Sequence, residues 1–242
     1  MNLVKLIAEH VQPYEKPAVY LSGGLDSTIV LHHLREKLPQ TKIYTYTAEF
    51  FTSGDELGKA KEVAKHYNAT HKVVPVDHFI ETLPEILKLF DRPRFNVWPW
   101  WLARQAKLDG RKTIYIGEGS DEIFGGYYDK SYLQAWAGQL TYIIPTYRTI
   151  HNYYNLDLET PFLRLPWKGL LDLYTPPDKI FLKSAYKNIL PDFVINAPVQ
   201  PPGFCKYAEF LTLDLTEEDC TDGEAKARLQ KLTTRMWLKE NR

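Results

Sequence analysis

Two adjacent glycines stand among hydroxyl side chains and a carboxylate near the start of the sequence. Residues 22–28 read Ser-Gly-Gly-Leu-Asp-Ser-Thr and follow a short apolar run that ends at Leu21. Glycines let backbone N–H groups approach a phosphate closely, and the hydroxyls add further donors. A carboxylate such as Asp26 can hold a magnesium ion that bridges phosphate oxygens. The spacing therefore predicts a phosphate-binding loop, although a glycine pair can also serve only as a tight turn.

A second group of carboxylates and glycines lies at residues 117–127, which read Gly-Glu-Gly-Ser-Asp-Glu-Ile-Phe-Gly-Gly-Tyr. It follows a predicted strand, and open α/β sheets bind ligands beyond the carboxyl ends of their strands. Asp121 is suited to a second contact on the magnesium ion that Asp26 holds. Glu118 can orient a ligand or transfer a proton. The two segments together predict one metal site, Asp26 with Asp121.

These two segments need a sheet to position them, and the first half of the chain predicts one. Four strands are expected, at residues 18–21, 43–47, 72–76 and 113–116. Apolar residues at helical spacing separate them, including a helix that begins at about residues 25–27, directly after the glycine pair. Strands that alternate with helices are typical of a parallel, doubly wound α/β sheet.

The second half of the chain has a different pattern. Aromatic residues and helical spacing without strand alternation predict a helical C-terminal part, 128–242, after an α/β core, 1–127, within one domain of 1–242. The turn-rich segment 196–203 interrupts it and is a candidate lid. Helices are also expected at residues 1–10 and about 224–239.

The two motifs resemble those of a known family. Ser-Gly-Gly-x-Asp-Ser after a first strand is similar to the loop of the ATP pyrophosphatase (PP-loop) superfamily, whose members cleave ATP between its α- and β-phosphates. The run at 117–127 resembles the signature of the asparagine synthetase synthetase domain, and weaker similarity extends over about residues 15–204. The resemblance implies a sheet of the adenine nucleotide alpha hydrolase type, with ATP and Mg²⁺ as cofactors.

The resemblance and the chemistry of the residues themselves together predict roles for individual residues. The residues expected to bind ATP are Leu21, Ser22, Gly23, Gly24, Asp26, Ser27, Thr28, Thr47, Ala48, Gly117 and Glu118. The residues expected to bind the substrate are Arg92, Arg94, Ser120 and Asp121. Arg92 and Arg94 can hold a carboxylate through paired hydrogen bonds. The three tryptophans of residues 98–101 either stack on a ring or form a buried cluster.

The sequence departs from this family at three places, and the segment 91–101, with its two arginines beside three tryptophans, is one of them. Glutamine-dependent members carry a cysteine at position two as the nucleophile of a glutaminase domain, whereas this chain has Asn2. We therefore expect ammonia from solution, a separate glutaminase subunit or another amine. The family's Arg-x-Lys before Gly-Phe is replaced at residues 197–204 by Ala-Pro-Val-Gln-Pro-Pro-Gly-Phe. Lys183 and Lys206 are candidates for the missing catalytic cation, beside Glu118 as a catalytic residue.

The amino-acid composition limits the kinds of partner that the protein is expected to bind. Thirty basic and thirty acidic residues give zero formal net charge, which disfavours a general nucleic-acid binder without excluding it. Cys205 and Cys220 have no second set of ligands at metal spacing, which predicts reduced thiols. Because no apolar run approaches the ~20 residues that span a membrane, the sequence predicts a cytoplasmic protein. The oligomeric state stays open, with a homodimer among the options.

These observations predict an AMP-forming carbon–nitrogen ligase that adenylates a small-molecule carboxylate and joins it to ammonia or another amine. Two alternatives remain open. One is an adenylating enzyme that modifies a nucleoside or a tRNA, which an aromatic and arginine-rich surface would suit. The other is a catalytically silent nucleotide-binding partner subunit, which the missing Arg-x-Lys lysine would suit.

Overall fold

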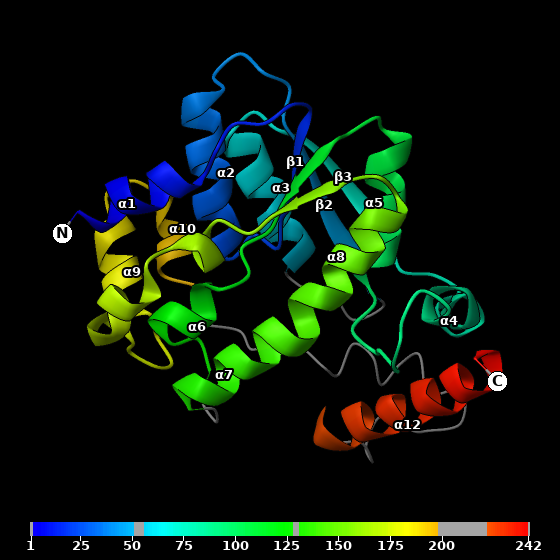
Figure 1. The fold of residues 1–242 in the computed structure, drawn as a ribbon. Coiled ribbons are helices and arrows are strands. Elements are labelled where there is room, and N and C mark those ends of the chain that lie inside the picture. The colour runs from blue at the N-terminus through cyan, green and yellow to red at the C-terminus, as the bar shows by residue number, and fades with distance from the viewer. Residues whose placement is uncertain (1, 51–55, 128–130, 198–221, 242) are drawn as a thin grey trace.

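The fold is built on one sheet of five parallel strands, in the order β3-β2-β1-β4-β5 (Figure 1). The computed structural model describes residues 2–50, 56–127, 131–197 and 222–241. The strands are β1 (Pro17–Tyr20), β2 (Tyr44–Glu49), β3 (Thr70–Pro75), β4 (Thr113–Tyr115) and β5 (Asp157–Glu159). The chain runs outward from β1 to β3 and then returns to the other side of β1 at β4. The loops after β1 and β4 therefore flank the point where the strand order reverses, where such sheets bind ligands.

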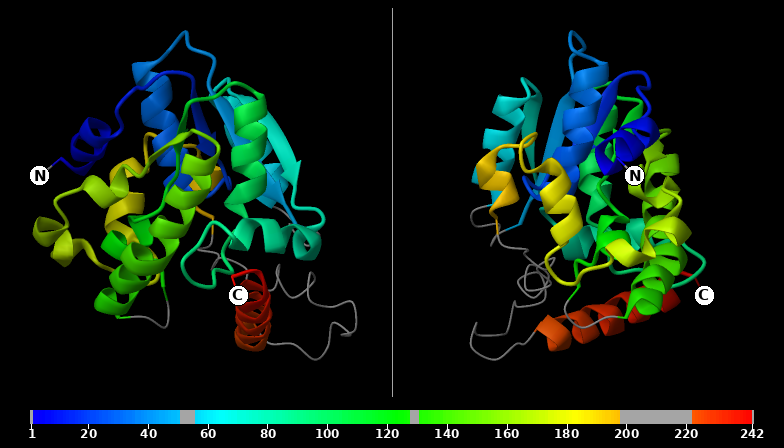
Figure 2. Two further views of the ribbon diagram at one scale, coloured as in Figure 1. Left: turned by 45° about the vertical axis from the view of Figure 1, so that its right-hand side comes forward. Right: turned by 90° about the vertical axis from the view of Figure 1, so that its left-hand side faces the viewer.

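Helices pack on both faces of the sheet (Figures 1 and 2). The α-helices are α1 (Leu3–His10), α2 (Leu25–Lys37), α3 (Glu56–His66), α4 (Phe79–Leu87), α5 (Pro99–Leu108), α6 (Ser120–Phe124), α7 (Tyr132–Gly138), α8 (Ile144–Tyr153), α9 (Ile180–Tyr186), α10 (Asp192–Ile195) and α12 (Asp222–Glu240). A π-helical turn, η1 (Gln139–Ile143), joins α7 to α8, and two 3₁₀ segments are η2 (Phe162–Arg164) and η3 (Trp167–Leu173). The C-terminal α12 lies against α4.

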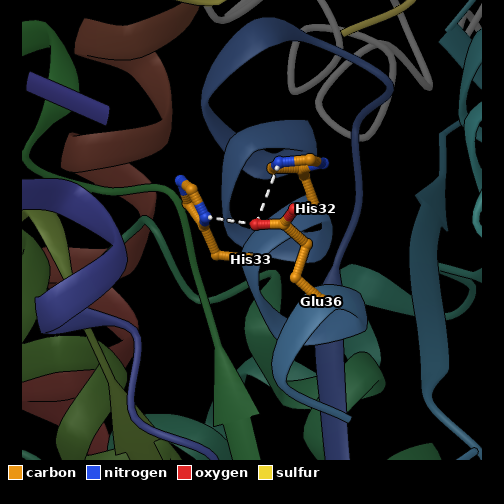
Figure 3. A group of neighbouring side chains, drawn as sticks. All are labelled: His32, His33 and Glu36. Atoms are coloured by element: carbon orange, nitrogen blue, oxygen red, sulfur yellow. Dashed lines mark ion pairs between the residues drawn. The ribbon is translucent and has the colours of Figure 1, made fainter. Parts of the chain in front are cut away.

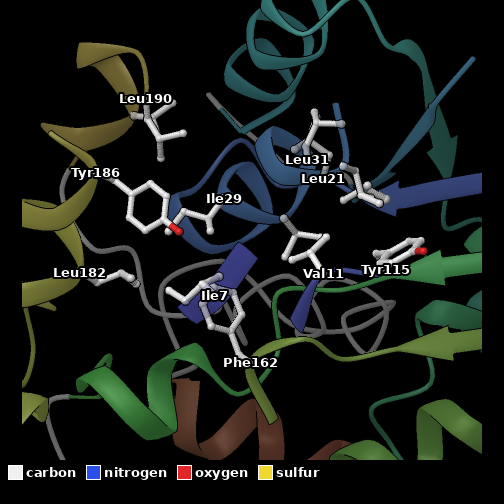
Figure 4. Close-up of a cluster of buried hydrophobic side chains, with 14 of the residues drawn as sticks. Ile7, Val11, Leu21, Ile29, Leu31, Tyr115, Phe162, Leu182, Tyr186 and Leu190 are labelled. Carbon is white, nitrogen blue, oxygen red and sulfur yellow. The ribbon is translucent and has the colours of Figure 1, made fainter. Parts of the chain in front are cut away.

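Alternate residues of the central strands enter two separate hydrophobic clusters. Val19 and Leu21 belong to the cluster formed with α1, α2, α3 and α9, part of which is drawn in Figure 4. Ala18 and Tyr20 belong to the other cluster, formed with α4, α5 and α8. Side chains on a strand point alternately to its two faces, so both faces of the sheet are buried. The expected parallel, doubly wound α/β fold is confirmed.

Most elements of the first half agree with their predicted positions. Each of the four predicted strands lies within two residues of an observed strand, and α2 begins at Leu25, directly after the glycine pair. The predicted terminal helices correspond to α1 and α12. No helix within the described ranges combines the length and the apolar character that a membrane crossing needs.

The second half is mainly helical, as predicted, but it also contributes a strand that the sequence did not predict. β5 pairs with β4 in parallel, Ile114 opposite Leu158, and so adds a strand from the second half to the edge of the sheet. Its three residues, Asp-Leu-Glu, are too few to show a period in the sequence. The sheet therefore crosses the predicted boundary at residue 127. Most of the segment 196–203 and Lys206 lie outside the described residues.

Candidate active site

The predicted phosphate loop connects β1 to α2. Gly23 has a positive φ of 77°, and a Cβ there would lie 2.6 Å from the backbone nitrogen of Ala60 on α3, so only glycine fits. Gly24 is the N-cap of α2 and provides no side-chain cap, which leaves the N–H groups of the first turn available to an anion. Ser22 is exposed, and its hydroxyl lies 3.2 Å from that of Ser27. The loop thus has the backbone geometry and the donors of an anion-binding site.

The loop after β4 packs directly on the start of α2. A Cβ on Gly117 would lie 2.9 Å from both the Cβ of Asp26 and the backbone nitrogen of Ser27. Ser120, at the start of α6, is buried and donates to Asp26 Oδ1 at 2.7 Å. The structure therefore brings the two motifs together. It gives Ser120 a positioning contact with Asp26, while direct contact of Ser120 with substrate stays a prediction.

Asp26 and Asp121, the two predicted metal ligands, meet at one lysine. Lys179 Nζ lies 2.6 Å from Asp26 Oδ2 and 2.5 Å from Asp121 Oδ1, and its side chain is 5% exposed. Burial favours neutral lysine, but the two carboxylates outweigh it and raise the pKa of Lys179 above its ordinary value. The ammonium group is therefore charged and holds both carboxylates at the phosphate loop.

Gly126 leaves room for this arrangement. A Cβ there would lie 1.6 Å from Asp121 Oδ1 and 2.8 Å from Lys179 Cε. The backbone N–H of Gly126 also donates to the carbonyl oxygen of Asp121 at 3.1 Å. Lys179 itself has a positive φ of 50°, and its N–H donates to Thr175. The segment before α9 is thus folded onto α6, which brings the lysine into the site.

The carboxylate geometry fits a magnesium site. One oxygen each of Asp26 and Asp121 converges on the same point, which the Lys179 ammonium now holds, and carboxylate oxygens are the protein ligands Mg²⁺ prefers. Both carboxylate side chains are partly exposed, 23% and 31%, so an ion that arrives with phosphates can reach them. The residues present are therefore compatible with the predicted metal.

Glu118 is held by a residue on the π-helical turn. Gln139 is buried, and its side-chain amide donates to Glu118 Oε2 at 2.5 Å. Burial raises the pKa of Glu118 to about 7, with the amide of Gln139 acting in the opposite direction. π-helical turns often occur at functional sites because they aim one residue away from the helical repeat. Glu118 is therefore a carboxylate that changes charge near neutral pH.

Glu122 is a second carboxyl with a raised pKa, on α6. Tyr127 donates to Glu122 Oε1 at 2.8 Å, whereas no described residue bonds to its Oε2. Burial raises the pKa of Glu122 from its ordinary value of 4.5 to about 8. Ionising this carboxyl therefore costs folding free energy.

Replacing Glu122 with glutamine is expected to stabilise the protein by about 2 kcal/mol at neutral pH. Because the folded pKa exceeds the unfolded value, the wild type loses stability as pH rises from 4.5 to about 8. The amide cannot ionise, so Glu122→Gln keeps that stability while still accepting the Tyr127 hydrogen bond. Urea unfolding at several pH values measures the difference. Parallel pH dependences in both proteins would contradict the expectation.

Arg92 and Arg94 line a cavity of about 420 Å³ between the loop after α4 and the start of α8. Arg92 is exposed and pairs with its neighbour Asp91. Arg94 is 5% exposed, lies over the ring of Tyr142 and donates to the Tyr142 carbonyl at 3.3 Å. Its Nε has no hydrogen-bond partner among the described residues. A role for these arginines in binding a carboxylate stays a prediction.

The neighbouring tryptophans form a buried aromatic cluster. Trp100 and Trp101 are 3% and 6% exposed, and Trp101 donates to the Asp77 carbonyl at 3.0 Å. Trp98 packs between the rings of Tyr20 and Tyr147. Of the two interpretations of this segment, the structure supports the hydrophobic core and gives Trp100 and Trp101 no surface for stacking.

The remaining residues that were predicted to bind ATP or to act in catalysis lie at separate places in the structure. Thr47, buried at the end of β2, donates its hydroxyl to the carbonyl of buried Leu21, and Ala48 follows it. The hydroxyl of Thr28 donates to the Gly24 carbonyl at 2.7 Å, inside α2. Lys183 lies 3.5 Å from the Ala197 carbonyl. Lys179, by contrast, holds its ammonium group against Asp26 of the predicted phosphate loop.

Neither Lys179 nor Gln139 was predicted from the sequence to be a site residue. Lys179 stands in a segment, Pro177–Ile180, whose likeness to the family was visible, but nothing local distinguishes it from Lys183. Gln139 points at Glu118 only because a π-helical turn interrupts the helix around it. Neither contact is encoded within a short stretch of sequence.

Comparison with known proteins assigns the family. The Asparagine synthase family model matches residues 2–176, a range that contains both motifs. The chain belongs to the asparagine synthase family. A putative glutamine-hydrolysing asparagine synthetase of Mycobacterium tuberculosis is 35% identical over 127 residues, which cover 50% of this chain and 19% of that protein. Asparagine synthetase 1 of Bacillus subtilis is 33% identical over 115 residues, 45% of this chain and 18% of that protein. The chain thus matches about a fifth of the length of these relatives.

Among solved structures, the U34-tRNA thiolase NcsA of Methanococcus maripaludis aligns with a TM-score of 0.48 and 16% sequence identity, over 97% of this chain and 80% of that one. The NH3-dependent NAD synthetase of Campylobacter jejuni aligns with a TM-score of 0.42 and 13% identity, over 99% and 93%.

Proposed function

We propose that this asparagine synthase family member is an AMP-forming ligase, which adenylates a small-molecule carboxylate with ATP and converts it to an amide. One observation carries the proposal: the phosphate loop, the carboxylates Asp26 and Asp121, and the buried cation Lys179 converge at the point where the strand order reverses. Such an arrangement suits the binding of a nucleotide's phosphates.

In the first step, an oxygen of the substrate carboxylate forms a bond to the α-phosphorus of ATP. The bond from that phosphorus to the oxygen bridging to the β-phosphate breaks, and pyrophosphate leaves with the electron pair. The N–H groups of the loop and the first turn of α2 are aimed to bind the leaving pyrophosphate. Mg²⁺, when bound by Asp26 and Asp121, would neutralise phosphate charge.

In the second step, ammonia or another amine attacks the acyl carbon, and AMP leaves with the former carboxylate oxygen. The attacking nitrogen must lose a proton to become an amide nitrogen. Glu118, with a pKa raised to about 7, is suited to accept that proton near neutral pH. We propose that the ammonia comes from solution or from a separate glutaminase subunit.

We propose that the carboxylate substrate extends toward the cavity beside Arg92 and Arg94. The π-helical turn connects the two places. Gln139 contacts Glu118, while Tyr142 contacts Arg94 and its hydroxyl oxygen accepts a hydrogen bond from the Phe95 N–H at 2.8 Å. A substrate carrying a second anionic group would find a guanidinium there.

Replacing Gln139 with leucine is expected to shift the pH profile of AMP release toward alkaline pH by about one unit. The Gln139 amide lowers the pKa of Glu118 by bonding to the carboxylate, so its loss raises that pKa above about 7. If ionised Glu118 accepts the proton, activity rises with pH through this value. Steady-state rates across pH give the midpoint, and Leu140→Ala, at an exposed position on the same turn, is the control. An unchanged midpoint in Gln139→Leu would remove Glu118 from this role.

The proposal is tested with the protein, ATP, Mg²⁺ and ammonia against a panel of small carboxylates, with pyrophosphate release as the first measurement. For each active carboxylate, material labelled with ¹⁸O in the carboxyl group is expected to transfer one label to AMP. Asp26→Asn serves as the control without the metal-site carboxylate.

Two outcomes separate the alternatives. Bound ATP without pyrophosphate from any carboxylate would favour a silent subunit. Pyrophosphate release that requires a nucleoside or RNA acceptor would favour nucleic-acid modification, although the burial of Trp100 and Trp101 removes the stacking surface that motivated that alternative.

A further inference from the structure

Three potential metal ligands lie together on α2, about two turns beyond the phosphate loop. His32, His33 and Glu36 each present one ligand atom, and these atoms all lie within 4.8 Å of one another (Figure 3). Positions three and four apart share one face of a helix, which brings Glu36 beneath both rings. Asp26 lies six residues before His32, so about 9 Å of helix separates this cluster from the active site.

The distances match the spacing of ligands around a small cation. Glu36 Oε2 lies 3.4 Å from His32 Nε2 and 3.4 Å from His33 Nδ1. Bonds of 2.0–2.1 Å in a tetrahedral zinc site separate neighbouring ligand atoms by about 3.4 Å. Two of the three distances between ligand atoms therefore already match a tetrahedral zinc site. The third distance joins His32 Nε2 to His33 Nδ1. A small rotation of the His32 ring, whose side chain is 12% exposed, would shorten it.

The burial and orientation of His33 also point to a bound ligand. It is 1% exposed, and its Nδ1, which faces Glu36, has no hydrogen-bond partner among the described residues. Its Nε2 lies 2.7 Å from the hydroxyl of Tyr186 on α9. When Nε2 carries the proton and donates to Tyr186, the lone pair of Nδ1 points toward Glu36. Metal-ligating histidines are held in this way by a second hydrogen bond.

The local environment also keeps both imidazole rings neutral, which is the form that binds a metal. Burial lowers the pKa of His33 to about 4 and lowers the pKa of His32, so both are neutral at physiological pH. A neutral imidazole binds a metal without first losing a proton. Glu36 is 62% exposed on its side chain, which leaves the open side of the cluster in water.

We propose that His32, His33 and Glu36 form a binding site for one zinc-class divalent cation, separate from the active site and independent of the proposed function. Two imidazole nitrogens favour zinc, cobalt or nickel over magnesium. The three residues would fill three positions, and water would complete a tetrahedral set. Through the bond from His33 to Tyr186, the ion would strengthen the contact between α2 and α9.

The test uses the untagged full chain and Co²⁺ as a spectroscopic substitute for zinc. We expect visible d–d absorbance that saturates at one Co²⁺ per chain and disappears when Zn²⁺ is added. Cobalt bound to Cys205 or Cys220 would instead give a near-ultraviolet thiolate band, and cobalt bound to Asp26 and Asp121 would give only the weak absorbance of an oxygen site. Saturating Zn²⁺ is also expected to raise the thermal unfolding temperature.

Two substitutions assign the ligands. Glu36→Gln and His32→Gln are each expected to weaken Co²⁺ and Zn²⁺ binding at least tenfold. Glu62→Gln, which removes an exposed carboxylate from α3, is the matched control and should leave the affinity unchanged. The proposal is overturned if no saturable d–d absorbance appears, or if Glu36→Gln binds the metal as tightly as the wild type. Because the Glu36 side chain is exposed, the substitution is expected to leave the fold intact, and circular dichroism of the variant checks this.

Discussion

Replacing Lys179 with methionine is expected to destabilise the protein by about 3 kcal/mol at neutral pH and to abolish pyrophosphate release. The substitution keeps a long side chain of similar volume but removes the charge that bridges Asp26 and Asp121. The two carboxylates would then face each other in a partly buried site without their common partner. Urea unfolding measures the stability, and a coupled assay measures pyrophosphate.

The pH dependence distinguishes this cause from simple loss of packing. Burial raises the pKa of Asp26, and losing Lys179 would raise it further. A carboxyl whose folded pKa is raised gives most stability at low pH, so the defect of Lys179→Met should be smaller at about pH 5 than at about pH 8. Lys183→Met, one helical turn later, is the control. A defect of equal size at both pH values, or an equal defect in the control, would contradict the bridging role.

Replacing Gly126 with alanine is expected to lower the rate of pyrophosphate release at least a hundredfold, a transition-state cost of about 3 kcal/mol. The added Cβ would lie 1.6 Å from Asp121 Oδ1, so that carboxylate must leave its position beside Lys179. No charge or hydrogen-bonding group is removed. The measurement therefore reports how strictly the position of Asp121 is required.

Gly138→Ala provides the matched control for this substitution. No atom lies within 4 Å of a Cβ at that position, which ends α7, so the same chemical change meets open space. Alanine there should be neutral or slightly stabilising, because it favours helix over the unfolded chain. If Gly126→Ala retains the wild-type rate, or if Gly138→Ala loses as much, the steric argument for Asp121 fails.

The sequence was sufficient to locate the parts of the site that depend on local chain geometry. The glycine pair between a strand and a helix predicted a tight loop there, and the structure has this loop packed on Ala60 and Gly117, while phosphate binding stays a prediction. The first four strands were predictable because each is an apolar or β-branched run between helices. The meeting of Asp26 with Asp121 followed from topology, because parallel strands end at the same edge of the sheet.

The features that were missed depend on distant contacts. Lys179 acquires its role only when the segment before α9 folds onto α6, and it lies 153 residues from Asp26. β5 forms because β4 offers it an edge, since three residues carry no recognisable pattern. The segment 98–101 left two interpretations open, because aromatic residues are equally typical of cores and of binding surfaces.

The π-helical turn between α7 and α8 sets the rotational phase of two helices that otherwise form one rod. Gln139 lies at its beginning and Tyr142 near its end, and they contact Glu118 and Phe95 respectively. In a regular α-helix each residue advances by about 100°, so deleting one residue from this turn would rotate α8 by that angle relative to α7. The wider turn acts as a one-residue register offset, which allows a single helical rod to face the carboxylate of Glu118 at one level and an arginine-lined cavity at the next.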